Sequence, residues 1–139
     1  MTTLTDHNTT FSEAIPVEIN LNREARTLEL VYTNGERHTL SCEYLRVHSP
    51  SAEVRGHGHG EGVLQVGKKF VNINALEPIG NYAVKIAFDD GHDTGLFSWT
   101  YLLELGRQHE TMWKIYLDRL TEAGAKREPN LIGRWKPNG

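Results

Sequence analysis

The spacing of apolar residues changes once along this chain, and that change limits the folds that it can adopt. In the first two thirds, apolar residues recur at every second position in short runs, as at Val17, Ile19 and Leu21, which is the pattern of a half-buried β-strand. From Trp99 to about Ala123 they recur at helical spacing instead. Strands followed by helices predict an α+β fold, with a small, mostly antiparallel sheet and the C-terminal helices packed on one face.

Turn and capping residues indicate where the predicted elements begin and end. Asn34-Gly35 lies between two alternating runs and predicts a type I′ hairpin, because both residues tolerate positive φ. Ser41 and Ser98 are suitable N-caps for helices, and Gly124 is a suitable C-cap. The predicted strands are 17–21, 28–32, 37–40, 71–76, 82–88 and 94–97, with a break at 77–80, and the predicted helices are 42–48 and 99–123, the second kinked or split at Gly106.

Length and composition limit the number of domains and the cellular compartment. With 139 residues, one domain is expected, which we place at residues 15–125 between flexible tails at 1–14 and 126–139. No apolar run approaches the ~20 residues that a membrane helix needs, and the N-terminus lacks the basic start and apolar core of a signal peptide. The single cysteine, Cys42, fits a reducing compartment, so we expect a cytoplasmic protein.

The charge balance argues against a nucleic-acid binder. The chain has 15 Lys and Arg against 18 Asp and Glu, a net charge of −3, whereas nucleic-acid-binding domains usually present a basic face. Basic residues form three local runs, at Lys68-Lys69, Lys126-Arg127 and Arg134–Lys136. Each run is too short to follow a nucleic-acid backbone.

A glycine- and histidine-rich stretch, LRVHSPSAEVRGHGHGEG at Leu45–Gly62, is the best candidate for a functional site. His57 and His59 stand two residues apart, and in an extended segment such side chains point the same way, roughly 6–7 Å apart. Both imidazoles could therefore reach one transition-metal ion, with His48 and His92 as candidate further ligands. The alternative interpretation is a surface loop whose histidines are solvated or only form hydrogen bonds.

Four segments of the chain carry a family resemblance. They read LRVHSPSAEVRGHG, DDGH, GLFSWTYLLELG and WxxYLxRLxxAG, and together they resemble the bacterial gamma-butyrobetaine-hydroxylase-like N-terminal domain over about residues 16–125. The resemblance implies a small α+β domain like the one that precedes the catalytic jelly roll in gamma-butyrobetaine and trimethyllysine hydroxylases. A similar domain is attached to some P-loop ATPases of iron–sulfur cluster assembly.

The resemblance also implies what becomes of a zinc site. The hydroxylase version holds a structural zinc through a C-x-C-x-x-C run and a distant histidine. The cysteine positions match Ser49, Ser51 and Val54 here, and the histidine matches His92. Serine and valine cannot replace thiolate ligands, so we expect that this zinc site does not form and that only His92 carries over.

Catalytic chemistry finds little support in the residues. His59-Gly60-Glu61 with a distant histidine mimics the 2-His-1-carboxylate site of iron oxygenases, but too few strands remain for an enclosing barrel. The alternating glycines lead into a predicted strand, whereas a P-loop leads into a helix.

Cys42 is either a thiol activated at a helix start or a small buried residue. The acidic turn 89–93 fits the φ angles of a turn, with His92 as its main candidate ligand.

We therefore expect a non-enzymatic accessory domain that binds a protein partner and, through its histidines, a divalent transition metal such as zinc or iron. Arg46 and Arg55 are candidates either to anchor an anionic partner or to pair with a carboxylate of the fold. By the resemblance, the setting is iron–sulfur cluster or metal handling, and the partner is a cluster-assembly ATPase or an oxygenase domain. The alternatives are a free-standing partner of a 2-oxoglutarate-dependent hydroxylase and a structural interaction module with no ligand. Neither nucleic acid nor membrane is an expected partner.

Overall fold

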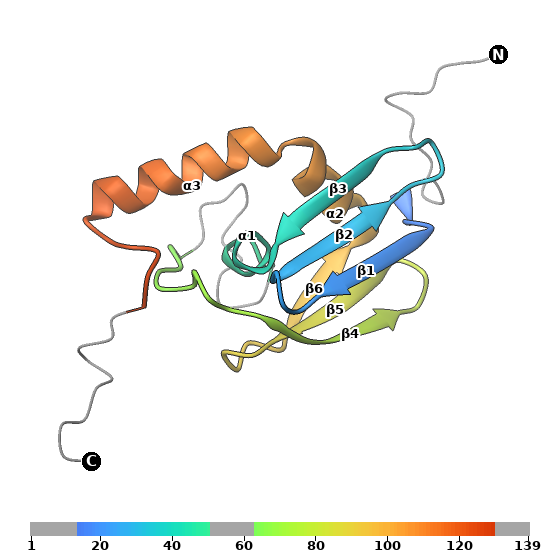
Figure 1. Ribbon diagram of the computed structural model, residues 1–139, viewed down its shortest axis with the longest axis horizontal. Helices are drawn as coiled ribbons and strands as arrows, with labels where there is room; N and C mark the ends of the chain where they lie inside the picture. Colours follow the sequence, from blue (N-terminus) through green and yellow to red (C-terminus); the bar gives the residue numbers. More distant parts are fainter. Residues whose placement is uncertain (1–13, 51–62, 130–139) are drawn as a thin grey trace.

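A computed structural model of the chain describes residues 14–50 and 63–129 (Figure 1). These residues form two three-stranded antiparallel sheets, ordered β1-β2-β3 and β4-β5-β6, and three helices. The α+β prediction is confirmed, with the strands divided between two sheets rather than joined in one. The strands are β1 (Glu18–Asn22), β2 (Thr27–Val31), β3 (Arg37–Ser41), β4 (Ile73–Ile79), β5 (Ala83–Phe88) and β6 (Gly95–Ser98), and the helices are α1 (Cys42–Val47), α2 (Trp99–Arg107) and α3 (His109–Ala123).

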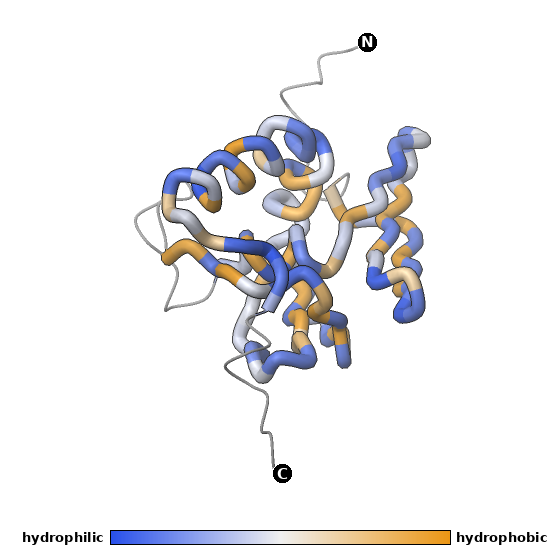
Figure 2. Tube along the Cα trace, turned by 60° about the vertical axis from the view of Figure 1, so that its left-hand side comes forward, coloured by the Kyte–Doolittle hydropathy of each residue, from blue (hydrophilic) through white to orange (hydrophobic). Residues whose placement is uncertain are grey.

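The period-two pattern sets the register of the first sheet. Leu28 of β2 lies opposite Leu21 of β1 and Leu40 of β3. Leu28, Leu30 and Leu40 are buried, and hydrophobic and hydrophilic residues alternate along the strands (Figure 2). A shift of one residue would turn these leucines to solvent, so the pattern admits one pairing.

The hairpin between β2 and β3 corrects the predicted type I′ turn. Gly35 has a φ of +90°, but Asn34 does not have the positive φ that this turn requires. Instead, the Gly35 amide donates to the Tyr32 carbonyl at 3.0 Å and the Tyr32 amide donates to the Glu36 carbonyl at 2.9 Å. Asn34 contributes its side chain, whose Oδ1 accepts from the Glu36 amide at 2.9 Å. One left-handed glycine and an Asx turn therefore close the loop.

Strand β4 runs through the predicted break at 77–80. Pro78 is paired in register with Val84 of β5, and the strand continues to Ile79. A proline is tolerated here because β4 is an edge strand of its sheet and needs no amide donor on its free side. The chain reverses only afterwards, at Gly80, which has a φ of +55°.

One hydrophobic core joins both sheets to α1 and α2. Helix α2 contacts β3 of one sheet and β6 of the other, which ties the two sheets together. Cys42 is fully buried, and burial raises the pKa of its thiol to about 11, so it is a small core residue rather than a reactive thiol. The largest fully buried side chains include Leu28, Leu30, Leu40, Tyr44, Leu45, Ile73, Ile86, Phe97, Leu102 and Leu105.

The long helical segment breaks at Gln108 and not at Gly106. Gln108 has φ −102° and ψ 21° between α2 and α3, whereas Gly106 lies inside α2. A Cβ on Gly106 would lie 2.6 Å from Cγ of His38, so this glycine permits close approach of α2 to β3. Gly124 ends α3 in the left-handed conformation, with φ +65°, as predicted.

Both predicted serine N-caps are confirmed. Ser41 Oγ accepts from the Tyr44 amide at 3.0 Å at the start of α1, and Ser98 Oγ accepts from the Tyr101 amide at 3.1 Å at the start of α2.

Among the helices of the described residues, none is long and apolar enough to cross a lipid bilayer.

Residues 126–129 pack beside residues 67–69 (Figure 1). The Gly67 amide donates to the Lys126 carbonyl at 3.1 Å, and the Lys69 amide donates to the Arg127 carbonyl at 3.0 Å. The Arg127 guanidinium also binds both carboxylate oxygens of Glu43 in α1, at 3.0 and 2.8 Å. The start of the tail predicted at 126–139 is thus attached to the rest of the domain.

Candidate functional site

Half of the predicted site residues meet at one place in the fold. Arg46 lies in the last turn of α1, His48 follows that helix, and His92 lies in the turn between β5 and β6. We call this place the α1 corner. It comprises Arg46, His48, Ser49, Lys68, Asp90 and His92. The other three predicted residues, Arg55, His57 and His59, lie outside the described residues.

Ser49 and His92 contact each other directly. Ser49 Oγ and His92 Nε2 lie 2.9 Å apart, and Ser49 is buried. Gly95 of β6 makes room for this contact, because a Cβ on Gly95 would overlap Ser49 Oγ. These are two of the four positions where the family resemblance implies zinc ligands. A serine hydroxyl already bonded to the imidazole does not fit a zinc ion, which takes thiolate, imidazole or carboxylate ligands.

His48 is packed among aromatic rings. Its ring centroid is 4.6 Å from that of Tyr44 and 6.4 Å from that of Tyr116. Nδ1 lies 2.8 Å from the Tyr44 carbonyl oxygen, and because a carbonyl only accepts, Nδ1 carries the hydrogen. Burial lowers the pKa of His48 below its usual 6.5, so the ring is neutral at neutral pH.

The histidines do not gather into a metal centre within the described part of the chain. Among residues 14–50 and 63–129, no three His, Cys, Asp or Glu side chains are close enough together to hold a metal ion. A metal site that used His48 or His92 would need further ligands from outside the described residues, for which His57 and His59 are the candidates. The metal hypothesis therefore stays a prediction.

Arg46 pairs with a carboxylate of the fold. Its Nε donates to Asp90 Oδ2 at 2.9 Å, and Lys68 Nζ donates to the same oxygen at 2.6 Å. Burial alone would raise the pKa of Asp90, but hydrogen bonds from Lys68 and the His92 amide and the charge of Arg46 outweigh it and lower that pKa. Two cations thus share one carboxylate oxygen.

A second feature, on the segment that leads into β4, was not predicted from the sequence. Three large apolar side chains are exposed within eight residues, Val63, Val66 and Phe70. Phe70 is 50% exposed, and two cations lie over its ring. The Arg26 Cζ lies 5.8 Å and the Lys69 Nζ 5.6 Å from the ring centroid, distances at which a cation is attracted to an aromatic face.

The backbone of Phe70 is held as well. Arg26 Nε donates to the Phe70 carbonyl at 3.1 Å, so one arginine fixes both the ring and the main chain. Arg26 itself has a φ of +58°, the one positive φ among the non-glycine residues that the structure describes. Residues held in that conformation carry strain and cluster at functional positions.

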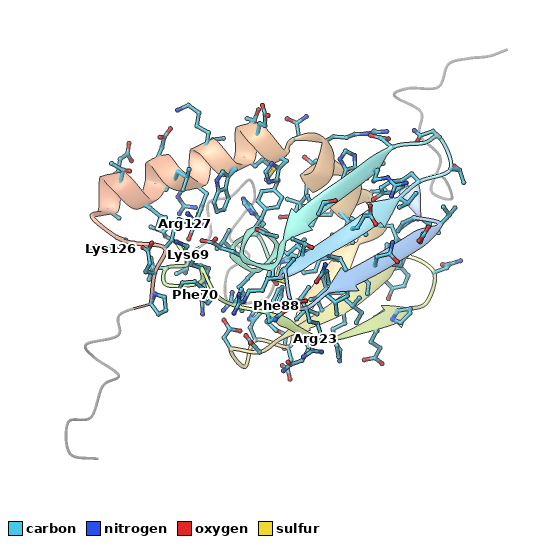
Figure 3. The ribbon with its side chains drawn as sticks, in the orientation of Figure 1. Arg23, Lys69, Phe70, Phe88, Lys126 and Arg127 are labelled. Atoms are coloured by element: carbon cyan, nitrogen blue, oxygen red, sulfur yellow. The ribbon has the colours of Figure 1, made fainter. Side chains whose placement is uncertain are left out.

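Cations from distant parts of the sequence surround Phe70. Lys69 and Phe70 lie beside Lys126 and Arg127 (Figure 3). Backbone hydrogen bonds between 67–69 and 126–127 hold the two segments together. In the sequence these basic runs are short and far apart, and only the tertiary fold brings them together. We define the Phe70 face as Val63, Val66 and Phe70 with the cations Arg26, Lys69 and Lys126. Within the described residues, Arg26 and Lys126 have no carboxylate partner.

The fold places the chain in a class of small α+β domains made of two antiparallel three-stranded sheets and covering helices. Within this class, the chain belongs to the family described as "Gamma-butyrobetaine hydroxylase-like, N-terminal", which matches residues 19–103. The resemblance noted in the sequence is thereby confirmed. No curated protein matches the chain.

Solved structures support the same assignment. Two NMR solution structures are 49% and 51% identical to the chain, with TM-scores of 0.73 and 0.74; they cover 84% and 91% of this chain and 91% and 92% of their own. A crystal structure from Acidithiobacillus ferrooxidans ATCC 23270 is 34% identical, with a TM-score of 0.57, and covers 68% of this chain and 94% of its own. It is described as a protein with unknown function of the DUF971 family.

Proposed function

We propose that this chain is a non-enzymatic domain that captures an acidic protein partner through the Phe70 face. The observation that carries the proposal is the half-exposed Phe70 ring, fixed by Arg26 and Lys69. Aromatic and arginine side chains dominate the energetic centres of protein interfaces. Because Phe70 is already held in place, a partner loses little side-chain entropy when it binds there.

The charge around Phe70 favours an acidic partner. Two cations of the Phe70 face, Arg26 and Lys126, lack a carboxylate partner within the described residues, although the whole chain carries a net charge of −3. A local excess of positive charge on an acidic protein steers partners of opposite charge. We expect capture to weaken as salt is raised, because exposed charges are screened.

The family resemblance suggests which partners to test first. We propose a cluster-assembly ATPase, with an oxygenase domain as the alternative, and a cytoplasmic setting. Metal binding by His57, His59 and His92, with zinc or iron as the ion, belongs to the same proposal. Elemental analysis of untagged protein, and metal titration of a variant that replaces all three histidines by alanine, test this part of the proposal.

Partner capture is tested with two matched aromatic variants. Phe70→Ser removes the ring from the Phe70 face, and Tyr82→Ser removes a ring that is also 50% exposed but lies at the other end of β4. We expect Phe70→Ser to weaken binding of the true partner by at least about tenfold, which is the loss of one interface hot spot, and Tyr82→Ser to leave it unchanged. Equal binding by the wild type and Phe70→Ser would refute the proposal.

A further inference from the structure

Arg46 contains a buried donor that the fold leaves unused. Its side chain is 8% exposed, and its Nη1 is buried and has no hydrogen-bond partner. Within the described residues, the only other such side-chain atom is the hydroxyl of Tyr32, which is neutral. Buried polar groups are almost always hydrogen-bonded, and an orphaned donor on a charged group calls for an acceptor.

The carboxylate beside Arg46 does not supply that acceptor. Asp90 Oδ2 already accepts from Arg46 Nε and from Lys68 Nζ, and Asp90 Oδ1 accepts from the His92 amide at 3.2 Å. A guanidinium commonly binds carboxylates through two of its nitrogens, and here one nitrogen is served. Arg46, Lys68 and Asp90 together carry one uncompensated positive charge.

We infer that Arg46 and Lys68 form a binding site for a carboxylate. The ligand's oxygens would accept from Arg46 Nη1 and Lys68 Nζ, while Asp90 keeps Arg46 Nε. Lys68 and Asp90 are 21% and 20% exposed, so the site opens to solvent on their side. A monoanion neutralises the single excess positive charge of Arg46, Lys68 and Asp90. A dianion such as phosphate would overcompensate that charge and be repelled more strongly by the Asp90 carboxylate.

The inference deepens the proposed function, since Lys68 adjoins Lys69 of the Phe70 face and a partner's acidic side chain is the natural source of the carboxylate. A free carboxylic acid has the same chemistry. The two sources are separated by titrating acetate first, without any partner, and then a peptide from the partner with its acidic residues either present or replaced by amides.

The experiment is an NMR titration of the ¹⁵N-labelled full chain that follows the Arg46 Nε–Hε signal. We expect acetate to shift that signal saturably, and chloride at equal ionic strength to leave it in place. Phosphate above its second pKa is expected to bind more weakly than acetate. No saturable shift, or an equal shift with chloride, would overturn the inference and leave a water molecule as the acceptor.

Three variants make the test specific. Lys68→Gln is expected to weaken acetate binding by on the order of tenfold, the loss of one charge-assisted hydrogen bond. Lys69→Gln is the matched control, because it removes the same charge one residue away and leaves both donors of the site. Asp90→Asn is expected to tighten acetate binding about tenfold, because the competing carboxylate is gone.

These variants also separate the two proposals. If Lys69→Gln and Phe70→Ser leave partner capture unchanged while acetate still binds at Arg46, then the Phe70 face fails and the carboxylate site stands. If partner capture depends on Phe70 but acetate affinity is the same in the wild type, Lys68→Gln and Asp90→Asn, the carboxylate site fails alone. Circular dichroism of each variant confirms that a lost signal does not reflect unfolding.

Discussion

The α1 corner and the Phe70 face differ in how their chemistry is used. The corner has the histidine, serine and arginine residues that attract attention in the sequence, and most of their polar groups already form hydrogen bonds inside the fold. The Phe70 face has no motif, yet it exposes an aromatic ring and cations with no carboxylate partner in the described residues. A conspicuous residue type therefore marks a place in the fold, whereas the accessibility of its groups decides what can bind there.

The largest effect should come from the ion pair between helix α1 and the 126–129 segment beside the Phe70 face. Arg127 binds both oxygens of Glu43, whose side chain is 4% exposed. In the variant Arg127→Gln, the Glu43 carboxylate would remain buried without its cation, so we expect a loss of about 3 kcal/mol in the free energy of unfolding. Urea denaturation measures it. A loss below about 0.5 kcal/mol would show that water replaces Arg127 and that the regions are energetically separate.

A glycine substitution tests how tightly the α1 corner is packed. Gly95→Ala would place a Cβ against Ser49 Oγ, and we expect it to destabilise the protein by about 2 kcal/mol. Ser49→Ala alone removes one hydrogen bond to His92 and should cost about 1 kcal/mol. Because Ser49→Ala also removes the clashing oxygen, the double variant should be more stable than the sum of the single effects implies. Strict additivity in thermal unfolding would contradict this packing.

Acid should affect the corner more than the Phe70 face. The pKa of Asp90 is lowered from its usual 3.8 in the folded protein, so Asp90 contributes stability that is present above pH 3.8 and is lost as pH falls through the folded-state pKa. We expect a contribution below about 1 kcal/mol, because the site is partly exposed. In the variant Asp90→Asn, the free energy of unfolding, measured by urea denaturation at a series of pH values, should fall less steeply below pH 3.8 than in the wild type.

The matched control for the acid experiment is Glu128→Gln. The pKa of Glu128 is also lowered, by a backbone hydrogen bond and by Lys69, but its carboxylate is exposed and screened by solvent. Its removal should leave the acid limb of the curve unchanged. A larger effect of Glu128→Gln than of Asp90→Asn would reverse our ranking of the two regions.

The smallest effect on stability should come from Phe70 itself. Phe70→Ser removes a half-exposed ring from the surface, and surface substitutions usually change the free energy of unfolding by no more than about 0.5 kcal/mol. Substitutions at the Phe70 face would then change partner binding more than stability, and substitutions in the α1 corner would mainly change stability. A loss above about 2 kcal/mol in chemical denaturation would mean that Phe70 serves the fold and not a partner.

Local patterns made much of the fold predictable. The alternation around Leu28 and the serine caps at Ser41 and Ser98 act over a few residues, and the structure has them as expected. The helix break could not be placed, because the reason for Gly106 is its contact with His38, almost seventy residues away. The same limit explains why Pro78 was expected to end a strand. Its tolerance depends on β4 lying at a sheet edge.

The candidate sites were predictable to different degrees for the same reason. Arg46, His48 and His92 could be selected because residue type and family resemblance mark them, but their bonds to Asp90, Tyr44 and Ser49 depend on tertiary contacts. The Phe70 face has no such markers. Its basic runs are separated by almost sixty residues of sequence and become neighbours only through backbone hydrogen bonds between 67–69 and 126–127.

Those backbone hydrogen bonds have a mechanical consequence. The Gly67 and Lys69 amides are bonded to the carbonyls of Lys126 and Arg127, so the segment that leads to Phe70 and the segment that leaves α3 should move together. A force on the chain after Pro129, from a bound or covalently attached body, would reach the backbone at Lys69, next to Phe70, and would also reach helix α1 through the pair of Arg127 and Glu43. A load on the C-terminal side of this domain should therefore change the position of the Phe70 side chain.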